Sequence, residues 1–457
     1  MLSSWVVSEK GLAVASFITR KKLSSFRIVI LGFAIIIFFG TTLLMLPISS
    51  RSGEAASFSD AIFTATSATC VTGLVVRDTA SGWTAFGQIV ILTMIQLGGL
   101  GVVLASASFA LISGKRISLG ERSMLQSTFA APKVEGMVRM VKFIIKVTLI
   151  TELVGAVAMM PTLCGEYGIR GVWLAVFLSI SAFCNAGFDI LGTAETPYAS
   201  LTAYADNPIV CITISLLIVL GGIGFITWND IIANRGKVKR YTMQSKVILT
   251  TTAILIAVPA LSFFVFEYGN LPGTERALAS LFHSVTTRTA GFNVEDVATM
   301  SEPSKAFTIV LMLIGGSPGS TAGGIKTTTL AVLLANFVSV CFRREESNLF
   351  GRRIVDDTIK QASAVFMMYV GFTLLGGAAI SFFEGLPYLS CLFECASAIG
   401  TVGLTCGITP GLGAFSRIIL MSFMFLGRVG GLTIVYAATK DLHRNVGRLP
   451  HEDIAVG

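Results

Sequence analysis

Apolar stretches long enough to cross a lipid bilayer recur along the whole chain of 457 residues. A helix needs about 20 apolar residues to span a membrane. Eight stretches meet that length: 27–47, 85–111, 141–161, 207–233, 245–267, 305–340, 363–384 and 414–438. With 53% hydrophobic and only 13% charged residues, a soluble fold would expose large apolar patches. We therefore expect an all-α membrane protein with eight transmembrane spans.

Several function classes are disfavoured by the polar residues. The formal net charge is +8, but the basic residues stand in short runs between apolar stretches, so we expect membrane lipid and no nucleic acid as a partner. The eight cysteines show no CxxC spacing and only three histidines occur, so no metal site is expected beyond transported ions. No HExxH, GxSxG or Walker pattern occurs, which argues against an enzyme and against a nucleotide cofactor bound by this chain.

Four shorter stretches, each too short to span, alternate with the long ones at 57–69, 171–184, 275–287 and 388–399. Each is followed by a four-residue motif with glycine in third place: VTGL at 71–74, NAGF at 185–188, TAGF at 289–292 and TVGL at 401–404. Successive motif glycines are 114, 104 and 112 residues apart. This near-constant period indicates four internal repeats.

A second glycine motif keeps the same register in the long stretches that follow: IQLGGLG at 95–101, IVLGGIG at 218–224, MLIGGSPG at 312–319 and MFLGRVGG at 424–431. We expect each repeat to contain a first span (M1), a short pore helix, an extended segment and a second span (M2). The resulting units are 1–112, 113–234, 235–341 and 342–457. For the second glycine motifs, close helix packing is as good an explanation as a role in the pore.

The distribution of basic residues sets the expected orientation. Five segments that fall on one side of an eight-span topology hold 24 of the 34 Lys and Arg residues: 1–27, 113–142, 235–246, 343–360 and 440–448. By the positive-inside rule this side is the cytoplasm. We expect a multi-pass protein of the inner (plasma) membrane with both termini in the cytoplasm, so that the short stretches dip in from the outer face.

Non-helical backbone at membrane depth is tolerated only where it is buried in protein or lines water. Four converging extended segments would form a ring of carbonyl oxygens able to replace the hydration shell of K⁺. Glycine permits the backbone angles that such a ring needs. The candidate potassium filter consists of three residues from each repeat: Val71, Thr72, Gly73, Asn185, Ala186, Gly187, Thr289, Ala290, Gly291, Thr401, Val402 and Gly403.

These motifs, over about residues 20 to 440, resemble those of the Trk/Ktr/HKT potassium transporter superfamily, most closely its bacterial KtrB subunits. The resemblance implies four M1–pore loop–M2 repeats around a pseudo-fourfold pore. It also implies a homodimer, sodium-stimulated potassium uptake and a cytoplasmic nucleotide-binding ring subunit of the KtrA type. Family members that pass sodium carry serine at the first filter position, whereas this chain has Gly73, which favours potassium as substrate.

The third M2 stretch is interrupted by LIGGSPGSTAGGIKTTTL at 313–330. Five glycines and a proline cannot sustain a regular helix, so a loop within the membrane is expected, and in the resembled family this loop is the gate. The candidate gate residues are Gly315, Gly316, Ser317, Pro318, Gly319, Ser320, Thr321, Ala322, Gly323, Gly324, Lys326 and Arg428.

Two cations lie at the depth of this loop. Arg428 is expected to hold the loop closed by hydrogen bonds to its carbonyl or hydroxyl groups, since a charge inside the bilayer needs a partner. For Lys326 two interpretations stay open, a role in the gate or extension of its side chain toward cytoplasmic water. A secondary transporter that couples cation flux to another solute or to protons stays open as the alternative function.

Overall fold

A computed structural model describes residues 25–112, 119–129, 135–193, 195–431 and 433 of the chain. Helices make up nearly all of its regular structure, and the predicted all-α class is confirmed. Four long outer helices correspond to the predicted M1 spans: α2 (Ser25–Leu44), α8 (Met137–Tyr167), α12 (Met243–Phe266) and α16 (Asp356–Glu384). Each is followed by a short helix, and the four short helices are α3 (Phe58–Cys70), α9 (Arg170–Phe183), α13 (Gly273–Thr286) and α17 (Tyr388–Gly400).

The inner helices, which correspond to the predicted M2 spans, are less regular. They are α5 (Ala85–Leu100) with α6 (Val102–Ile112), α10 (Pro208–Gly222) with α11 (Phe225–Asn234), α14 (Glu302–Leu313) with α15 (Thr327–Cys341), and α18 (Ala414–Val429). The remaining elements are α4 (Thr79–Gly82), α7 (Leu119–Phe129), an antiparallel pair β1 (Asn348–Leu349) and β2 (Arg352–Arg353), and the 3₁₀ turns η1 (Pro47–Ser49), η2 (Thr202–Tyr204), η3 (Val238–Arg240), η4 (Val297–Thr299) and η5 (Thr409–Gly411).

Two inner helices differ from the single spans expected at 85–111 and 207–233. Helices α5 and α6 meet at an angle of 101°, and α10 and α11 at 95°. Both breaks fall in the second glycine motif, at Gly101 and Gly224, whose φ angles are +84° and +88°. Residues other than glycine avoid positive φ angles. The two glycines therefore permit a turn that the apolar composition alone does not indicate.

Among the residues that the structure describes, four single helices are long and apolar enough to cross a membrane, and two bent pairs meet the same test when each is taken together. The expected span at 305–340 is divided between α14 and α15. Of the expected span at 414–438, residues 432 and 434–438 lie outside the described residues. The outer helices carry exposed large apolar side chains, such as Phe266 and Phe382, at 81% and 84% exposure. Such a surface suits contact with lipid.

Local sequence explains where several helices begin. The Ser57 hydroxyl accepts a hydrogen bond from Asp60 N (3.1 Å) at the start of α3. Thr84 caps α5 in the same way, and Asn207 caps α10, where Pro208 occupies the first helical position. Such caps satisfy amide groups that have no partner within the helix, and they fix where α3, α5 and α10 begin.

The helices pack as a closed ring. Each outer helix packs against the short helix that follows it. Each inner helix also packs against the short helix of the next repeat, in the pairs α5 with α9, α10 with α13, α14 with α17 and α18 with α3. The last pair joins the fourth repeat to the first. The C-terminal halves of the short helices are therefore enclosed by neighbouring helices, and nearly all of their residues there are buried.

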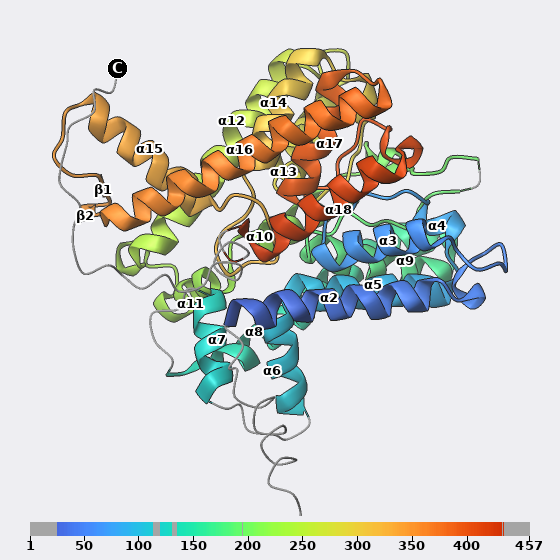
Figure 1. Ribbon diagram of the computed structural model, residues 1–457, viewed down its shortest axis with the longest axis horizontal. Helices are drawn as coiled ribbons and strands as arrows, with labels where there is room; N and C mark the ends of the chain where they lie inside the picture. The colour runs from blue at the N-terminus through green and yellow to red at the C-terminus, as the bar shows by residue number, and fades with distance from the viewer. Residues whose placement is uncertain (1–24, 113–118, 130–134, 194, 432, 434–457) are drawn as a thin grey trace, which may run out of the picture.

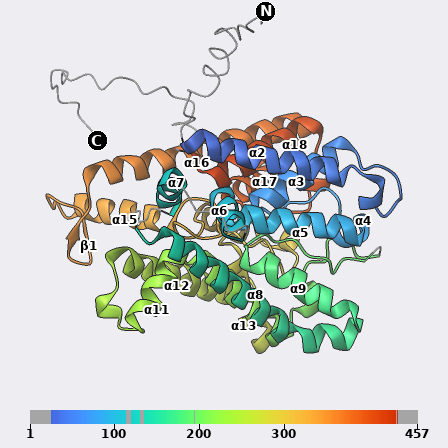
Figure 2. The ribbon, with the colours of Figure 1, turned by 90° about the horizontal axis from the view of Figure 1, so that it is seen from below.

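The figures show how this ring is laid out. In Figure 1, α2, α5, α16 and α18 extend from side to side of the picture, whereas α6 and α7 lie at a steep angle to them. The β1–β2 pair and α15 lie at one end of the long helices, and α4 lies at the opposite end. Figure 2 shows α2 and α16 on one side of the molecule and α8 and α12 on the other. The segments between the short and inner helices contact one another within this ring.

Candidate functional site

The four glycine motifs that follow the short helices share one backbone conformation. The residue two before each motif glycine has a positive φ: 57° at Val71, 58° at Asn185, 79° at Thr289 and 51° at Thr401. The motif glycines have φ angles of 90°, 68°, 82° and 99°. A positive φ at a β-branched residue is a costly conformation, of order 1–3 kcal/mol, that persists only where the surroundings impose it. In the first and fourth motifs this residue is the C-cap of the short helix, and the recurrence of the conformation shows that the four segments are built alike.

The four segments touch one another in cyclic order. A Cβ placed on Gly73 would lie closer than 3.0 Å to Ala186 O in the next segment. The same relation holds for Gly187 with Ala290 O, for Gly291 with Val402 O and for Gly403 with Thr72 O. The last contact closes the circle between the fourth and first segments. Each glycine is therefore required twice, for its φ angle and for the approach of a neighbouring carbonyl group.

Hydroxyl groups of the short helices hold these segments in place. Ser67 Oγ accepts a hydrogen bond from Gly73 N (3.1 Å), and Ser397 Oγ accepts one from Gly403 N (3.0 Å). In the other two segments the hydroxyl donates instead. Ser181 Oγ donates to Phe188 O (2.7 Å), and Thr286 Oγ1 donates to Phe292 O (2.6 Å). The first and fourth segments thus share one mode of support, and the second and third share another.

The glycine-rich stretch at 315–324 is a loop between α14 and α15, as its composition predicts. Its ends are joined by a parallel bridge between Ile314 and Ile325. Backbone groups of the loop bond to the break between α10 and α11: Ser317 N donates to Gly222 O (2.9 Å), Thr321 N donates to Gly221 O (3.2 Å), and Gly319 O accepts from Phe225 N (2.9 Å). The loop is therefore attached to the inner helix of the second repeat.

The loop also lies directly against the glycine motifs that follow the short helices. A Cβ on Gly323 would collide with the side chain of Thr401, and one on Gly324 would lie 3.1 Å from Gly400 O. The Thr321 hydroxyl donates to Phe183 O (3.0 Å), at the end of the second short helix. These contacts place the loop beside the C-terminal ends of the second and fourth short helices, where the second and fourth segments begin.

Arg428 connects the loop to the first repeat. Its guanidinium donates to Thr321 O in the loop, and it donates to Gly98 O (2.6 Å) and Gly99 O (2.7 Å) near the end of α5. Because these carbonyls belong to two repeats and the arginine to a third, one side chain joins three parts of the ring. The sequence indicated loop carbonyls as partners of Arg428 but gave no sign of Gly98 or Gly99.

Lys326 bonds back to the loop that precedes it. Its Nζ donates to Ala322 O (2.8 Å) and to Gly323 O (3.4 Å), both within the loop. Of the two interpretations left open by the sequence, the contacts favour a role in fixing the loop.

A cavity of about 320 Å³ lies beside the loop. Its walls come from α2, the corner between α5 and α6, the loop and the end of α18, and they include Phe33, Gly101, Lys326 and Arg428. No residue of the four glycine motifs that follow the short helices lines this cavity. Within the described residues, no group of three His, Cys, Asp or Glu side chains could hold a metal ion.

The first glycine of the second motif serves close packing in three repeats. A Cβ on Gly98, Gly221 or Gly427 would collide with a carbonyl near the end of a short helix, respectively Thr69 O, Phe183 O and Ile399 O. In the third repeat Gly315 packs instead against Gly323 O of the loop. Close packing therefore accounts for these glycines, and the breaks in α5–α6 and α10–α11 use other glycines of the same motifs.

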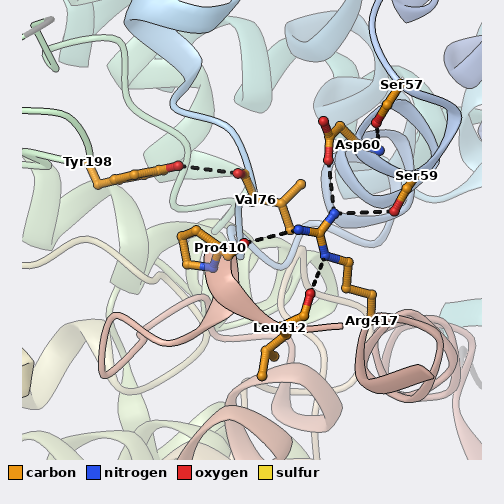
Figure 3. A network of polar contacts seen from close by, with 8 residues as sticks. All are labelled: Ser57, Ser59, Asp60, Val76, Tyr198, Pro410, Leu412 and Arg417. Atoms are coloured by element: carbon orange, nitrogen blue, oxygen red, sulfur yellow. Dashed lines mark hydrogen bonds and ion pairs between the residues drawn. The ribbon is translucent and has the colours of Figure 1, made fainter. Parts of the chain in front are cut away.

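Two polar clusters at the opposite end of the ring were missed by sequence reasoning (Figure 3). Arg417, at the start of α18, forms an ion pair with Asp60 of α3 (2.9 Å) and donates to Pro410 O (3.0 Å) and Leu412 O (2.9 Å). Tyr198 donates its hydroxyl to Val76 O (3.2 Å). These contacts join the fourth and the second repeats to the first. No spacing of motifs in the sequence predicts them.

Both the sequence and the fold have known relatives. The family model described as TrkH, a cation transport protein, matches residues 12–445. The potassium/sodium uptake protein NtpJ of Enterococcus hirae is 38% identical over 96% of this chain and 98% of its own length. The Ktr system potassium uptake protein B of Bacillus subtilis is 38% identical over 94% of this chain and 96% of its own.

The fold has a counterpart among solved structures. The crystal structure of the potassium transporter TrkH from Vibrio parahaemolyticus matches with a TM-score of 0.72 and 18% sequence identity, over 92% of this chain and 86% of that one. At this identity the match concerns the fold alone. The resemblance seen in the motifs is confirmed: the chain belongs to the TrkH family of cation transport proteins, and it is a multi-pass membrane protein with the fold of that family.

Proposed function

We propose that the chain is the ion-translocating membrane subunit of a potassium uptake system, and that K⁺ passes through the ring formed by the four glycine motifs. One observation carries the proposal: the carbonyl oxygens of Thr72, Ala186, Ala290 and Val402 each lie against the glycine of a neighbouring segment in a closed circle. Backbone carbonyls arranged around one axis replace the hydration shell of K⁺. The names of the relatives, a potassium/sodium uptake protein and a potassium uptake protein, support K⁺ as a substrate.

The glycine-rich loop acts as the gate in this proposal. It lies between the ring and the cavity of about 320 Å³, and it is held by Arg428 from one side and by the α10–α11 break from the other. A segment with two arrangements can switch a pathway without altering the selective site. Movement of α5, α10 or α18 would then release the loop.

The assembly follows the Ktr relatives. The units 1–112, 113–234, 235–341 and 342–457 act as four repeats, with both termini and the basic loops in the cytoplasm of a cell whose plasma membrane holds the protein. The functional protein is a homodimer controlled by a cytoplasmic nucleotide-binding ring of the KtrA type. Sodium stimulates uptake as an activator, and this chain binds no nucleotide of its own.

Replacement of the filter glycines tests the substrate and the site together. In cells that lack potassium uptake, the wild-type gene should restore growth at limiting K⁺, and Gly73→Ser and Gly403→Ser should each lower the K⁺ affinity and the preference for K⁺ over Na⁺. The reason is the collision of the added Cβ with Ala186 O or Thr72 O together with the unfavourable φ. Gly411→Ser, at an exposed turn where a Cβ meets no atom within 4 Å, is the matched control.

Affinity and selectivity that stay unchanged in both filter variants, with normal membrane insertion, would refute the filter assignment. Initial rates measured with a proton gradient, a sodium gradient or neither distinguish channel-like flux from coupled transport. A wild-type gene that fails to restore growth, with or without its ring partner, would refute potassium uptake itself.

A further inference from the structure

We propose that Glu394 is a positioning residue that fixes the fourth filter segment, and that it contributes to the discrimination between K⁺ and Na⁺. The proposal rests on the filter function proposed above for the glycine ring. It concerns a buried carboxylate that neither the filter motif nor the gate includes.

Glu394 lies in α17, nine residues before Gly403, and its side chain is fully buried. Its Oε1 accepts hydrogen bonds from Thr405 Oγ1 (2.6 Å) and Cys406 N (2.9 Å). Its Oε2 accepts one from Thr409 Oγ1 (2.6 Å). All three donors belong to the chain that leaves the filter, so one carboxylate holds that chain against its own short helix.

The hydrogen bonds continue beyond the carboxylate. Thr405 Oγ1 also accepts from Gly407 N (2.9 Å) and lies 3.3 Å from Thr409 Oγ1. Gly407 has a φ of +83°, which completes a turn around the carboxylate. Because a buried carboxylate without hydrogen-bond donors is strongly unfavourable, the turn and the side chain hold each other in one arrangement.

Gly403 is consequently fixed from both sides. Ser397 Oγ accepts from Gly403 N, and the Glu394 network begins at Thr405, two residues later. Gly403 in turn packs against Thr72 O, and Val402 O packs against Gly291. A displacement of the outgoing chain would therefore move carbonyl groups at two contacts of the ring.

The arrangement is specific to the fourth repeat. The positions nine residues before the other filter glycines hold Thr64, Leu178 and Phe282, which carry no charge. The buried hydroxyl of Thr64 has no hydrogen-bond partner within the described structure. Glu394 thus holds the fourth segment more firmly than the uncharged residues at the matching positions hold the other three. The fourth segment therefore helps to determine the geometry of the ring.

The experiment compares substitutions on both sides of the network. Glu394→Met keeps the size and removes both acceptors, Glu394→Gln removes the charge and keeps one acceptor, and Thr409→Val removes one donor. Glu384→Gln is the matched control. This carboxylate, at the end of α16 in the same repeat, accepts hydrogen bonds from Gly413 N (2.9 Å) and Ser416 Oγ (2.5 Å). KM for K⁺, the maximum rate, and the K⁺-over-Na⁺ preference are measured in cells, with surface abundance determined for each variant.

We expect the K⁺-over-Na⁺ preference to fall about tenfold in Glu394→Met, equivalent to about 1.4 kcal/mol, and by a smaller factor in Glu394→Gln and Thr409→Val. Glu384→Gln should keep the wild-type preference. A purely structural carboxylate would lower abundance and the maximum rate while KM and the preference stay constant, and that result would overturn the proposal. If Glu394→Met does not reach the membrane, an unchanged preference in Thr409→Val and Glu394→Gln overturns it equally.

The filter variants separate this proposal from the one on which it rests. If Gly403→Ser changes the preference and the Glu394 and Thr409 variants do not, the filter stands and the role of Glu394 is refuted. If Gly403→Ser also has no effect, the filter assignment fails first, and the proposal for Glu394 fails with it.

Discussion

Removal of the Arg428 side chain should raise the maximum rate of transport while leaving ion preference intact. In Arg428→Ala the loop loses its bond to the guanidinium at Thr321 O, and α5 loses two at Gly98 O and Gly99 O. The filter glycines make none of these contacts, so the ring keeps its geometry.

The size of the effect follows from the bond that opening must break. A hydrogen bond to a charged group contributes about 1.5–3 kcal/mol, and each ~1.4 kcal/mol is a tenfold change in an equilibrium. Loss of the Thr321 contact should therefore shift the closed-to-open ratio by at least about tenfold. The bonds from the loop to Gly221 and Gly222 remain, so the loop opens more often without being lost. A deletion within 317–322 removes those bonds as well and should give the larger increase.

The assay is initial uptake of K⁺ and Na⁺ in uptake-deficient cells, with and without the ring partner. Arg428→Ala and the deletion should both show a higher maximum rate, a weaker dependence on the partner, and an unchanged K⁺-over-Na⁺ preference. Arg51→Ala, at an exposed arginine near the opposite end of the ring, is the control. Normal insertion of both variants with wild-type rates and wild-type partner dependence would show that the loop is a passive interruption of the helix.

Three further predictions concern stability and topology. Arg417→Ala and Asp60→Asn should each lower the melting temperature of the detergent-solubilised protein, and the exchanged pair Arg417→Asp with Asp60→Arg should recover part of it; no recovery would mean that the 2.9 Å ion pair does not itself hold α18 against α3. Gly101→Ala should destabilise the protein by about 1–3 kcal/mol through its backbone conformation alone, since a Cβ there meets no atom within 4 Å, and an unchanged melting temperature would contradict the φ of +84°. A cysteine at Arg352 should resist an impermeant thiol reagent added outside intact cells and react once the membrane is opened, whereas labelling from outside would reverse the proposed topology.

Much of the fold was accessible from the sequence because its signals are local. The four short helices begin and end within two residues of the predicted stretches, since a glycine motif follows each of them. The loop at 315–324 was predicted from the five glycines and the proline that it contains. By contrast, the residues on both sides of Gly101 are equally apolar. A bend there changes neither composition nor period, so nothing in the pattern distinguishes it from a straight span.

The missed contacts have a different cause, which is distance along the chain. Arg417 and Asp60 are 357 residues apart, and Arg428 and Gly98 are 330 apart. No pattern within one repeat carries information about a partner at the far end of the sequence. Glu394 gave a weaker local sign, because a carboxylate within a short apolar helix requires donors and Thr405 and Thr409 follow nearby. That sign could have suggested the network before the structure was known.

The long-range contacts also have a place in the logic of the ring. Successive repeats are joined by the chain itself, but the fourth and first repeats are its two ends, so only non-covalent contacts close the circle between them. Helix α18 packs on α3 at this junction, with Arg417 on Asp60 toward one end and Arg428 on Gly98 and Gly99 toward the other. Arg428 is therefore both a part of this closure and the support of the loop. Because contacts between distant parts of a chain carry the largest loop-closure entropy, we expect this junction to loosen before the other three, and the proposed gate would then respond to small movements of α18 and α5.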